Sequence, residues 1–134
     1  MTKFEPHGDF SIRCGAGIMH MRVAGATNIE QIDQIGAEVD RFLDGNGERL
    51  CGILVELGDH AIMTNDATAR CNELIIGHME RGLCAAAFVV HSTEFREFII
   101  EQIRKFYDSV GLRWERFDDA ADARRWLEEQ IADI

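Results

Sequence analysis

CGILVEL, residues 51–57, is the stretch of the sequence that decides the fold. It is a short apolar run with β-branched side chains at Ile53 and Val55, and turn-forming segments bound it, GNG at 45–47 and GD at 58–59. Such a run predicts an inner strand of a β-sheet. The loop that follows, GDHAIMTN at residues 58–65, leads into a predicted helix. Functional groups of open α/β sheets gather at the carboxyl ends of strands, so this loop is the first candidate for a site.

Patterns on both sides of this strand predict a complete α/β chain. Residues 9–14 and 18–24 alternate between apolar and polar side chains and meet at glycines, which predicts an antiparallel hairpin. TNIE at residues 27–30 is a capping box that begins a first helix. Two more strands are predicted at 83–90 and 112–117, and three more helices begin at Asn65 or Asp66, Ser92 or Thr93, and Asp118 or Asp119. The predicted order is ββαβαβαβα.

This order predicts an α/β fold with a mixed, mostly parallel sheet, in a single domain over residues 1–134. Most strands carry polar residues on one face, namely Ser11, Arg13, His20, Arg22, Glu56, Arg113 and Glu115. We therefore expect the helices mainly on the other face. Leu54 would then lie on the thinly covered face and, with alternate residues of 83–90, form a surface through which two copies associate as a homodimer.

Composition and charge argue against several classes of function. The 134 residues carry a net charge of −10, whereas nucleic acids and anionic membranes bind clustered Lys and Arg. The longest apolar run, 83–90, is too short to form a transmembrane segment, and no secretory signal is evident, so we expect a cytoplasmic protein. The cysteines lie singly and the histidines form no ligand pair, so we expect neither a metal nor another cofactor.

The element order and the segment RWERFDDAADARRWLEE, residues 113–129, point to one known family. From Phe10 to Ile131 the chain resembles the STAS domains, named for sulfate transporters and anti-sigma-factor antagonists. It is more similar to their bacterial SpoIIAA-like branch, of STAS/SEC14 type. The resemblance implies a mixed sheet wound as one right-handed superhelix of βα turns, and no catalytic chemistry. The SEC14-like comparison implies an apolar ligand between the helices and the sheet.

Antagonist members of that family carry a phosphorylatable Ser in an Asp-Ser-Ser-Gly type motif, where the central strand meets the next helix. The corresponding residues here, 57–68, contain no Ser, and their only hydroxyls are those of Thr64 and Thr68. Thr64 is already explained as a helix cap. The chain therefore departs from the family's phosphorylation motif, and a regulator of the anti-sigma-factor-antagonist type stays an alternative hypothesis.

The function that we predict is a non-enzymatic binding or regulatory module, with no catalytic residues. It would contact a partner protein or a hydrophobic small ligand through the loop 58–65, which we expect to be mobile in the free protein. Apolar Ile62 and Met63 favour this hypothesis, because a merely solvated loop does not need them. The predicted binding residues are Asp59, His60, Ile62, Met63 and Thr64. The alternative is a small enzyme that uses a Cys/His pair, Cys71 and His60, at the same loop.

Aromatic residues recur on the third predicted helix, at Phe95, Phe98 and Phe106. Helical spacing places them on one stripe, and core packing is the default prediction for such a stripe. Their functional alternative is a cleft for a hydrophobic ligand, lined together with Trp126, Met63 and Ile62. The last predicted helix turns Ala123, Trp126, Leu127 and Ile131 inward.

Overall fold

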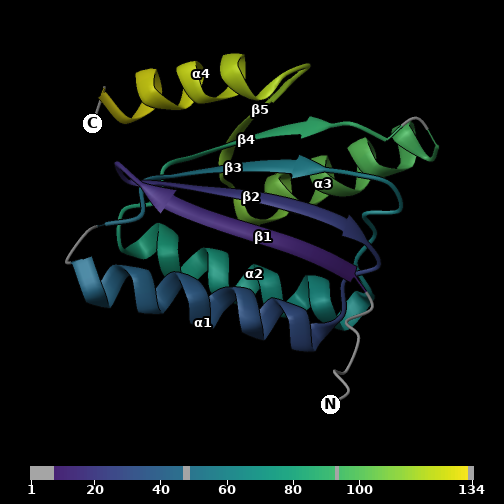
Figure 1. Ribbon diagram of the computed structural model, residues 1–134, viewed down its shortest axis with the longest axis horizontal. Coiled ribbons are helices and arrows are strands. Elements are labelled where there is room, and N and C mark those ends of the chain that lie inside the picture. The colour runs from purple at the N-terminus through teal and green to yellow at the C-terminus, as the bar shows by residue number, and fades with distance from the viewer. Residues whose placement is uncertain (1–7, 47–48, 93, 133–134) are drawn as a thin grey trace.

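The fold is a five-stranded β-sheet with helices on both of its faces, seen in a computed structural model that describes residues 8–46, 49–92 and 94–132 (Figure 1). The predicted order ββαβαβαβα is confirmed. The elements are β1 (Gly8–Gly15), β2 (Ile18–Gly25), α1 (Ile29–Asn46), β3 (Gly52–Leu57), α2 (Asn65–Glu80), β4 (Ala85–Val90), α3 (Arg96–Val110), β5 (Arg113–Phe117) and α4 (Ala120–Ala132). None of the helices in these residues is long and apolar enough to cross a membrane.

The strands lie in the sheet in the order in which they occur in the chain. β1 and β2 are antiparallel and are joined by Ala16 and Gly17, with φ of 54° and 79°. Positive φ at both central residues is the geometry of the two-residue hairpin turn that follows the twist of the strands. β3, β4 and β5 then add in parallel. The register places Ser11, Arg22 and Glu56 in one row across the first three strands.

One face of the sheet is covered by α1, α2 and α3. The central strand contributes Ile53, Val55 and Leu57 to this side, and the next strand contributes Phe88 and Val90. The helices supply the rest of the main core, which includes Val39, Ile75, Ile99, Ile103, Phe106 and Tyr107. Alternate residues of the apolar runs recognised in the sequence thus form the main hydrophobic core.

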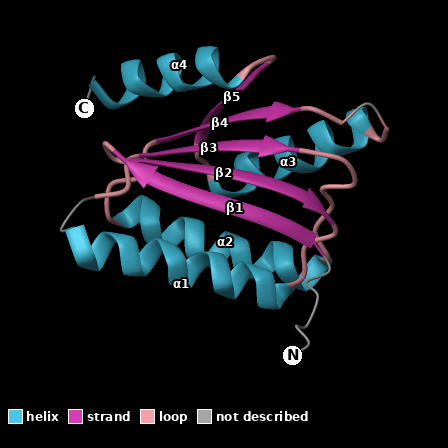
Figure 2. Cartoon of the chain, viewed as in Figure 1, coloured by secondary structure: helices cyan, strands magenta, loops and turns pink. Residues whose placement is uncertain are grey.

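The opposite face is covered only in part, by α4, which packs on β3, β4 and β5 (Figure 2). Ala85 and Ala87 present small side chains there, so the helix approaches the sheet closely and buries Ala123 and Leu127 completely. Leu54 is also completely buried in this cluster. Its expected place on a thinly covered, self-associating face is therefore wrong, because the last helix crosses to that side and covers it.

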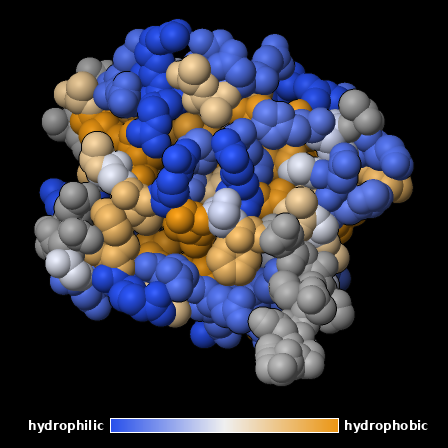
Figure 3. Space-filling model, viewed as in Figure 1, coloured by the Kyte–Doolittle hydropathy of each residue, from blue (hydrophilic) through white to orange (hydrophobic). Residues whose placement is uncertain are grey.

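The rest of that face, over β1 and β2, carries polar side chains. Arg13 and Arg22 are exposed, and Ser11 lies beside Arg22 on the neighbouring strand. Hydrophilic residues cover the outer sides of α1 and α4, and hydrophobic ones are visible between the two helices (Figure 3). The sheet is therefore open to solvent at its β1–β2 end, and side chains from three strands are accessible there.

Candidate functional site

The loop 58–65 lies at the carboxyl end of the central strand, as predicted, and hydrogen bonds hold it to its neighbours. The amide of Gly25 donates to the carbonyl of Asp59 (2.8 Å). The amide of Thr27 donates to the carbonyl of Ile62 (2.9 Å), and the carbonyl of Thr27 accepts from the amide of Thr64 (3.2 Å). The mobility that we predicted for this loop stays a prediction, and these bonds argue against it.

The side chain of Gln102, on α3, fixes the same loop from the other side. Its Oε1 accepts from the amide of Met63 (3.0 Å), and its Nε2 donates to the carbonyl of Ala61 (3.2 Å). Met63 is half-buried and packs against a small cluster that contains Ile32 and Ala67. Ile62 is half-buried as well. Both apolar side chains of the loop are therefore only partly exposed, and Met63 packs into the domain.

The polar residues of the loop face solvent. Asp59, His60 and Thr64 are all exposed. Thr64 is the cap of α2, since its Oγ1 accepts from the amide of Ala67 (3.2 Å) and donates to Asp66 (2.6 Å). This hydrogen bond from Thr64 is the main reason why the pKa of Asp66 is lowered. The predicted role of Thr64 as a helix cap is thus confirmed.

Two residues with left-handed backbone lie against each other at this end of the sheet. His60 has φ of 60° and Phe95 has φ of 56°, and their ring centroids are 5.7 Å apart. A bulky residue with such a φ is strained, and strain of this kind collects at functional sites. Phe95 and Phe98 are 56% and 55% exposed, so their predicted place in the core is wrong. We call His60, Phe95 and Phe98 the aromatic patch.

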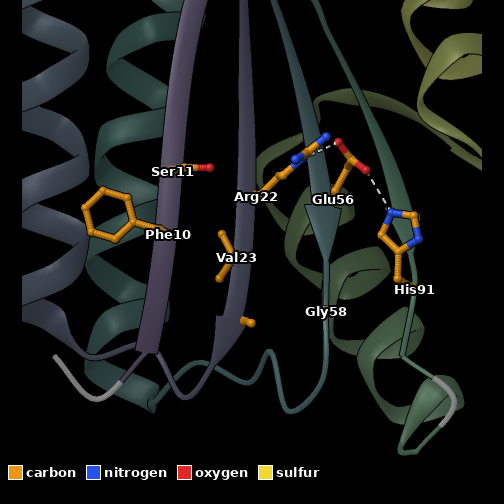
Figure 4. A pocket seen from close by; sticks show the side chains of 8 residues that line it. Phe10, Ser11, Arg22, Val23, Glu56, Gly58 and His91 are labelled. Carbon is orange, nitrogen blue, oxygen red and sulfur yellow. Dashed lines mark hydrogen bonds and ion pairs between the residues drawn. The ribbon is translucent and has the colours of Figure 1, made fainter.

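A second feature, on the open face of the sheet, is a charged cluster around Glu56. Glu56 is 7% exposed, and one carboxylate oxygen lies 2.5 Å from Nε2 of His20 and 3.1 Å from Nε of Arg22. The other oxygen lies 2.8 Å from Nε2 of His91, the first residue after β4. Figure 4 shows Arg22 and His91 on either side of Glu56. We call these four residues the Glu56 cluster.

The partners of Glu56 decide its ionisation. Burial by itself raises the pKa of this carboxyl, but the hydrogen bonds from His91, His20 and Arg22 outweigh burial and lower the pKa from 4.5 to about 2. Glu56 is therefore ionised at neutral pH and can only accept hydrogen bonds, so both Nε2 atoms must carry hydrogen. A carboxylate with so low a pKa is a poor general base, and its role is to hold its three partners in place.

A shallow hollow of about 470 Å³ lies over the Glu56 cluster. Its polar lining comes from Arg22, Glu56, His91 and Ser11, and the hydroxyl of Ser11 points toward Arg22 (Figure 4). The remaining lining residues are Phe10, Val23, Ala24 and Gly58. Phe10 and Val23 turn their side chains to the helix-covered face of the sheet, so the hollow has a polar floor, and Gly58 places it next to the predicted loop.

Sequence reasoning found the polar strand faces but not this cluster. The alternating strand pattern predicts His20, Arg22 and Glu56 on the poorly covered face, but it does not indicate that His91 joins them. A usable signal was present, since Glu56 is a carboxylate in the middle of an otherwise apolar strand. Such a group needs partners when it is buried, and basic residues at matching positions of neighbouring strands are the natural candidates.

One solved structure is similar to this chain over nearly its whole length. It is an uncharacterised protein from the DUF3478 family of Shewanella loihica PV-4, described as having a SpoIIAA-like fold. The alignment covers 95% of this chain and 98% of that chain, with 16% identity and a TM-score of 0.60. The chain has a SpoIIAA-like fold. No protein-family model matches the sequence, and no curated protein matches it significantly.

The SpoIIAA-like fold also encloses two small apolar cavities between the sheet and its three helices. Their volumes are about 70 and about 80 Å³. They share several lining residues, namely Met21, Ile32, Ile35, Val55, Cys71, Phe106 and Tyr107. The first is closed on one side by Ala61 and Met63 of the loop, with Gln102 beside them. The predicted loop therefore forms a wall of this cavity.

Cys71 lies in this apolar interior of the SpoIIAA-like fold and not at an accessible site. Burial raises the pKa of its thiol to about 12, and burial likewise raises the pKa of Tyr107. Its predicted partner His60 instead contacts Phe95 at the surface. No group of three or more His, Cys, Asp or Glu side chains within residues 8–46, 49–92 and 94–132 is placed to hold a metal ion.

Proposed function

We propose that the protein is a cytoplasmic, non-enzymatic binding module that recognises a protein partner through the aromatic patch. The observation that carries this proposal is the exposure of Phe95 and Phe98 beside His60, at the carboxyl end of the parallel strands. Aromatic side chains that are left in solvent at such an edge are typical anchors of protein interfaces. The strained backbone of Phe95 supports the proposal, because it holds the ring outward at a cost to stability.

The charges around the aromatic patch indicate the kind of partner. Asp59, Glu94 and Glu97 are exposed next to the three rings in the sequence, and the whole chain carries a net charge of −10. An acidic rim around an apolar centre suits a partner with an apolar hollow bordered by Lys and Arg. The same rim disfavours an anionic membrane surface.

The enzyme hypothesis has weaker support. A cysteine nucleophile must be a thiolate, and the raised pKa of Cys71 keeps its sulfur protonated at neutral pH. His60 lies on the surface against Phe95. The two residues therefore lack the contact that would let a histidine activate a cysteine.

The proposal is tested by affinity capture with three forms of the protein. Phe95→Ser combined with Phe98→Ser removes both anchors, and Ile76→Ser is the matched control, because Ile76 is 46% exposed on a different helix. We expect a partner to be retained by the wild type and by Ile76→Ser and lost from the double variant. If all three forms retain the same proteins, the aromatic patch is not the interface.

A second candidate is favoured by the cavities behind the loop. Each has about half the volume of an apolar cavity of about 150 Å³ that binds benzene, and their shared lining residues would let them join around a small hydrophobic ligand. Native mass spectrometry of the purified protein detects a retained ligand and also gives the number of subunits, so it tests the predicted homodimer as well.

Met63→Asp places a charge in the cavity wall and is expected to abolish retention of a ligand. Retention by that variant would contradict this second candidate.

A further inference from the structure

The hollow over the Glu56 cluster presents basic groups on a strongly acidic chain. Arg22 has 66% of its side chain exposed and His91 has 51%, whereas the side chain of Glu56 between them has only 9%. A molecule that enters the hollow therefore meets the side chains of Arg22 and His91 before it meets the carboxylate. Ser11 adds a hydroxyl on the neighbouring strand, directly opposite Arg22 in the register.

We propose that this hollow binds a small organic anion, whose carboxylate or phosphate group is held between Arg22 and His91. The site is independent of the aromatic patch and of the protein partner proposed above. Its donors lie on the open face of the sheet, where Ala24 adds one small apolar side chain. Phe10 and Val23 turn their side chains to the helix-covered face and pack on the core there, so the site matches a compact anion with little apolar surface.

Arg22 is suited to this role because Glu56 holds it by one nitrogen only. The hydrogen bond to the carboxylate uses Nε, at 3.1 Å. Among residues 8–46, 49–92 and 94–132, Glu56 is the hydrogen-bond acceptor of Arg22, and the contact leaves the two terminal nitrogens of the guanidinium group for another acceptor. Together these nitrogens match the two oxygens of a carboxylate or phosphate. Because Glu56 already tethers the arginine side chain, less conformational entropy of that side chain is lost when a ligand binds to it.

His91 complements Arg22 from the other side of the buried carboxylate. Its Nε2 is fixed as a donor to Glu56 at 2.8 Å, which leaves Nδ1 for the solvent side. A ring that is protonated on both nitrogens donates to Glu56 and to a second anion at the same time. The carboxylate of Glu56 therefore acts as a positioning group: it fixes the side chains of Arg22 and His91 without occupying all of their nitrogens.

The test measures binding of four defined anions by calorimetry and by NMR titration of the Arg22 Nε–H signal. Acetate and inorganic phosphate carry the head group alone, whereas benzoate and phenyl phosphate add an apolar body. We expect saturable binding that the added ring does not tighten, and the better of acetate and inorganic phosphate identifies the head group. Arg22→Gln should weaken binding at least tenfold.

Two further variants separate a built site from general attraction of charge. Arg104→Gln is the matched control, because it removes an exposed arginine on α3 and changes the net charge by the same amount. It should bind as the wild type does, while His91→Gln should weaken binding as Arg22→Gln does. Thermal unfolding establishes that each variant is folded. Arg22→Lys keeps the positive charge but loses the two parallel N–H donors of the guanidinium group, so its affinity for the anions should lie between those of the wild type and Arg22→Gln. Absence of saturation with all four anions, or equal losses in Arg22→Gln and Arg104→Gln, would overturn the proposal.

Discussion

Glu56→Gln tests most directly whether the ionised carboxylate of Glu56 stabilises the open face of the sheet. At about 1.4 kcal/mol for each unit of pKa, a carboxyl lowered from 4.5 to about 2 contributes about 3 kcal/mol to the free energy of unfolding at neutral pH. Solvent around the exposed Arg22 and His91 side chains reduces this toward about 2 kcal/mol. The glutamine amide cannot accept from three donors, so we expect the variant to lose about 2 to 3 kcal/mol at pH 7.

The loss should depend on pH in a direction that follows from the lowered pKa of Glu56. In the unfolded chain this carboxyl takes up a proton near pH 4.5, whereas in the folded protein it stays ionised to about pH 2. Its contribution is therefore complete above pH 4.5 and disappears as the pH falls toward 2. A protonated Glu56 resembles glutamine, so the difference between the wild type and Glu56→Gln should shrink toward zero.

Urea unfolding of both proteins at pH 7, 5, 3.5 and 2.5 measures this difference. Glu115→Gln is the control, because Glu115 is an exposed carboxylate on β5 and its loss should change stability by less than about 0.5 kcal/mol at every pH. If the wild type and Glu56→Gln differ by the same amount from pH 7 to pH 2.5, Glu56 does not hold its partners as an ionised carboxylate.

Three other predictions concern packing, the thiol and the loop. Leu127→Ala should cost about 2 to 5 kcal/mol in urea unfolding, since Leu127 on α4 is completely buried against the sheet, and a loss below about 1 kcal/mol would mean that this helix is peripheral. Labelling of Cys71 by a thiol reagent at pH 7.5 should be slow in the folded protein, because burial raises its pKa to about 12, and rapid labelling would revive the enzyme hypothesis. Gln102→Ala should speed hydrogen exchange at the amide of Met63 by tenfold or more, and an unchanged rate would show that the loop is held without this side chain.

Most of the fold could be predicted because local patterns determine it. The apolar runs at 51–57 and 83–90 have the length of buried strands, and Thr64 caps α2. The predicted cap of the third helix at Ser92 or Thr93 is wrong, because α3 begins after Phe95, which makes no capping hydrogen bond with its side chain. The prediction for Leu54 was wrong because the turn between the last strand and the last helix does not show on which side of the sheet that helix packs. Ala85 and Ala87 were the indication, since two alanines on one strand face leave room for a closely packed helix.

The candidate site was harder to predict for two reasons. Phe95 and Phe98 follow the apolar period of α3, but they lie at its amino end, and periodicity does not show where a helix runs past the edge of its sheet. The Glu56 cluster joins residues that are 34 to 36 positions apart in the sequence. Only the register of three strands brings them together, and register is a property of tertiary structure.

The order of the strands in the sheet also affects how the chain can fold while it is being synthesised. Each strand from β2 to β5 pairs with the strand that precedes it in the chain. A nascent polypeptide can therefore add one strand at a time as it leaves the ribosome, because no strand must wait for a later one to fill a gap beside it. α4 follows all five strands in the chain and covers Leu54 and Val89, so this face of the two central strands stays open until the sheet is complete.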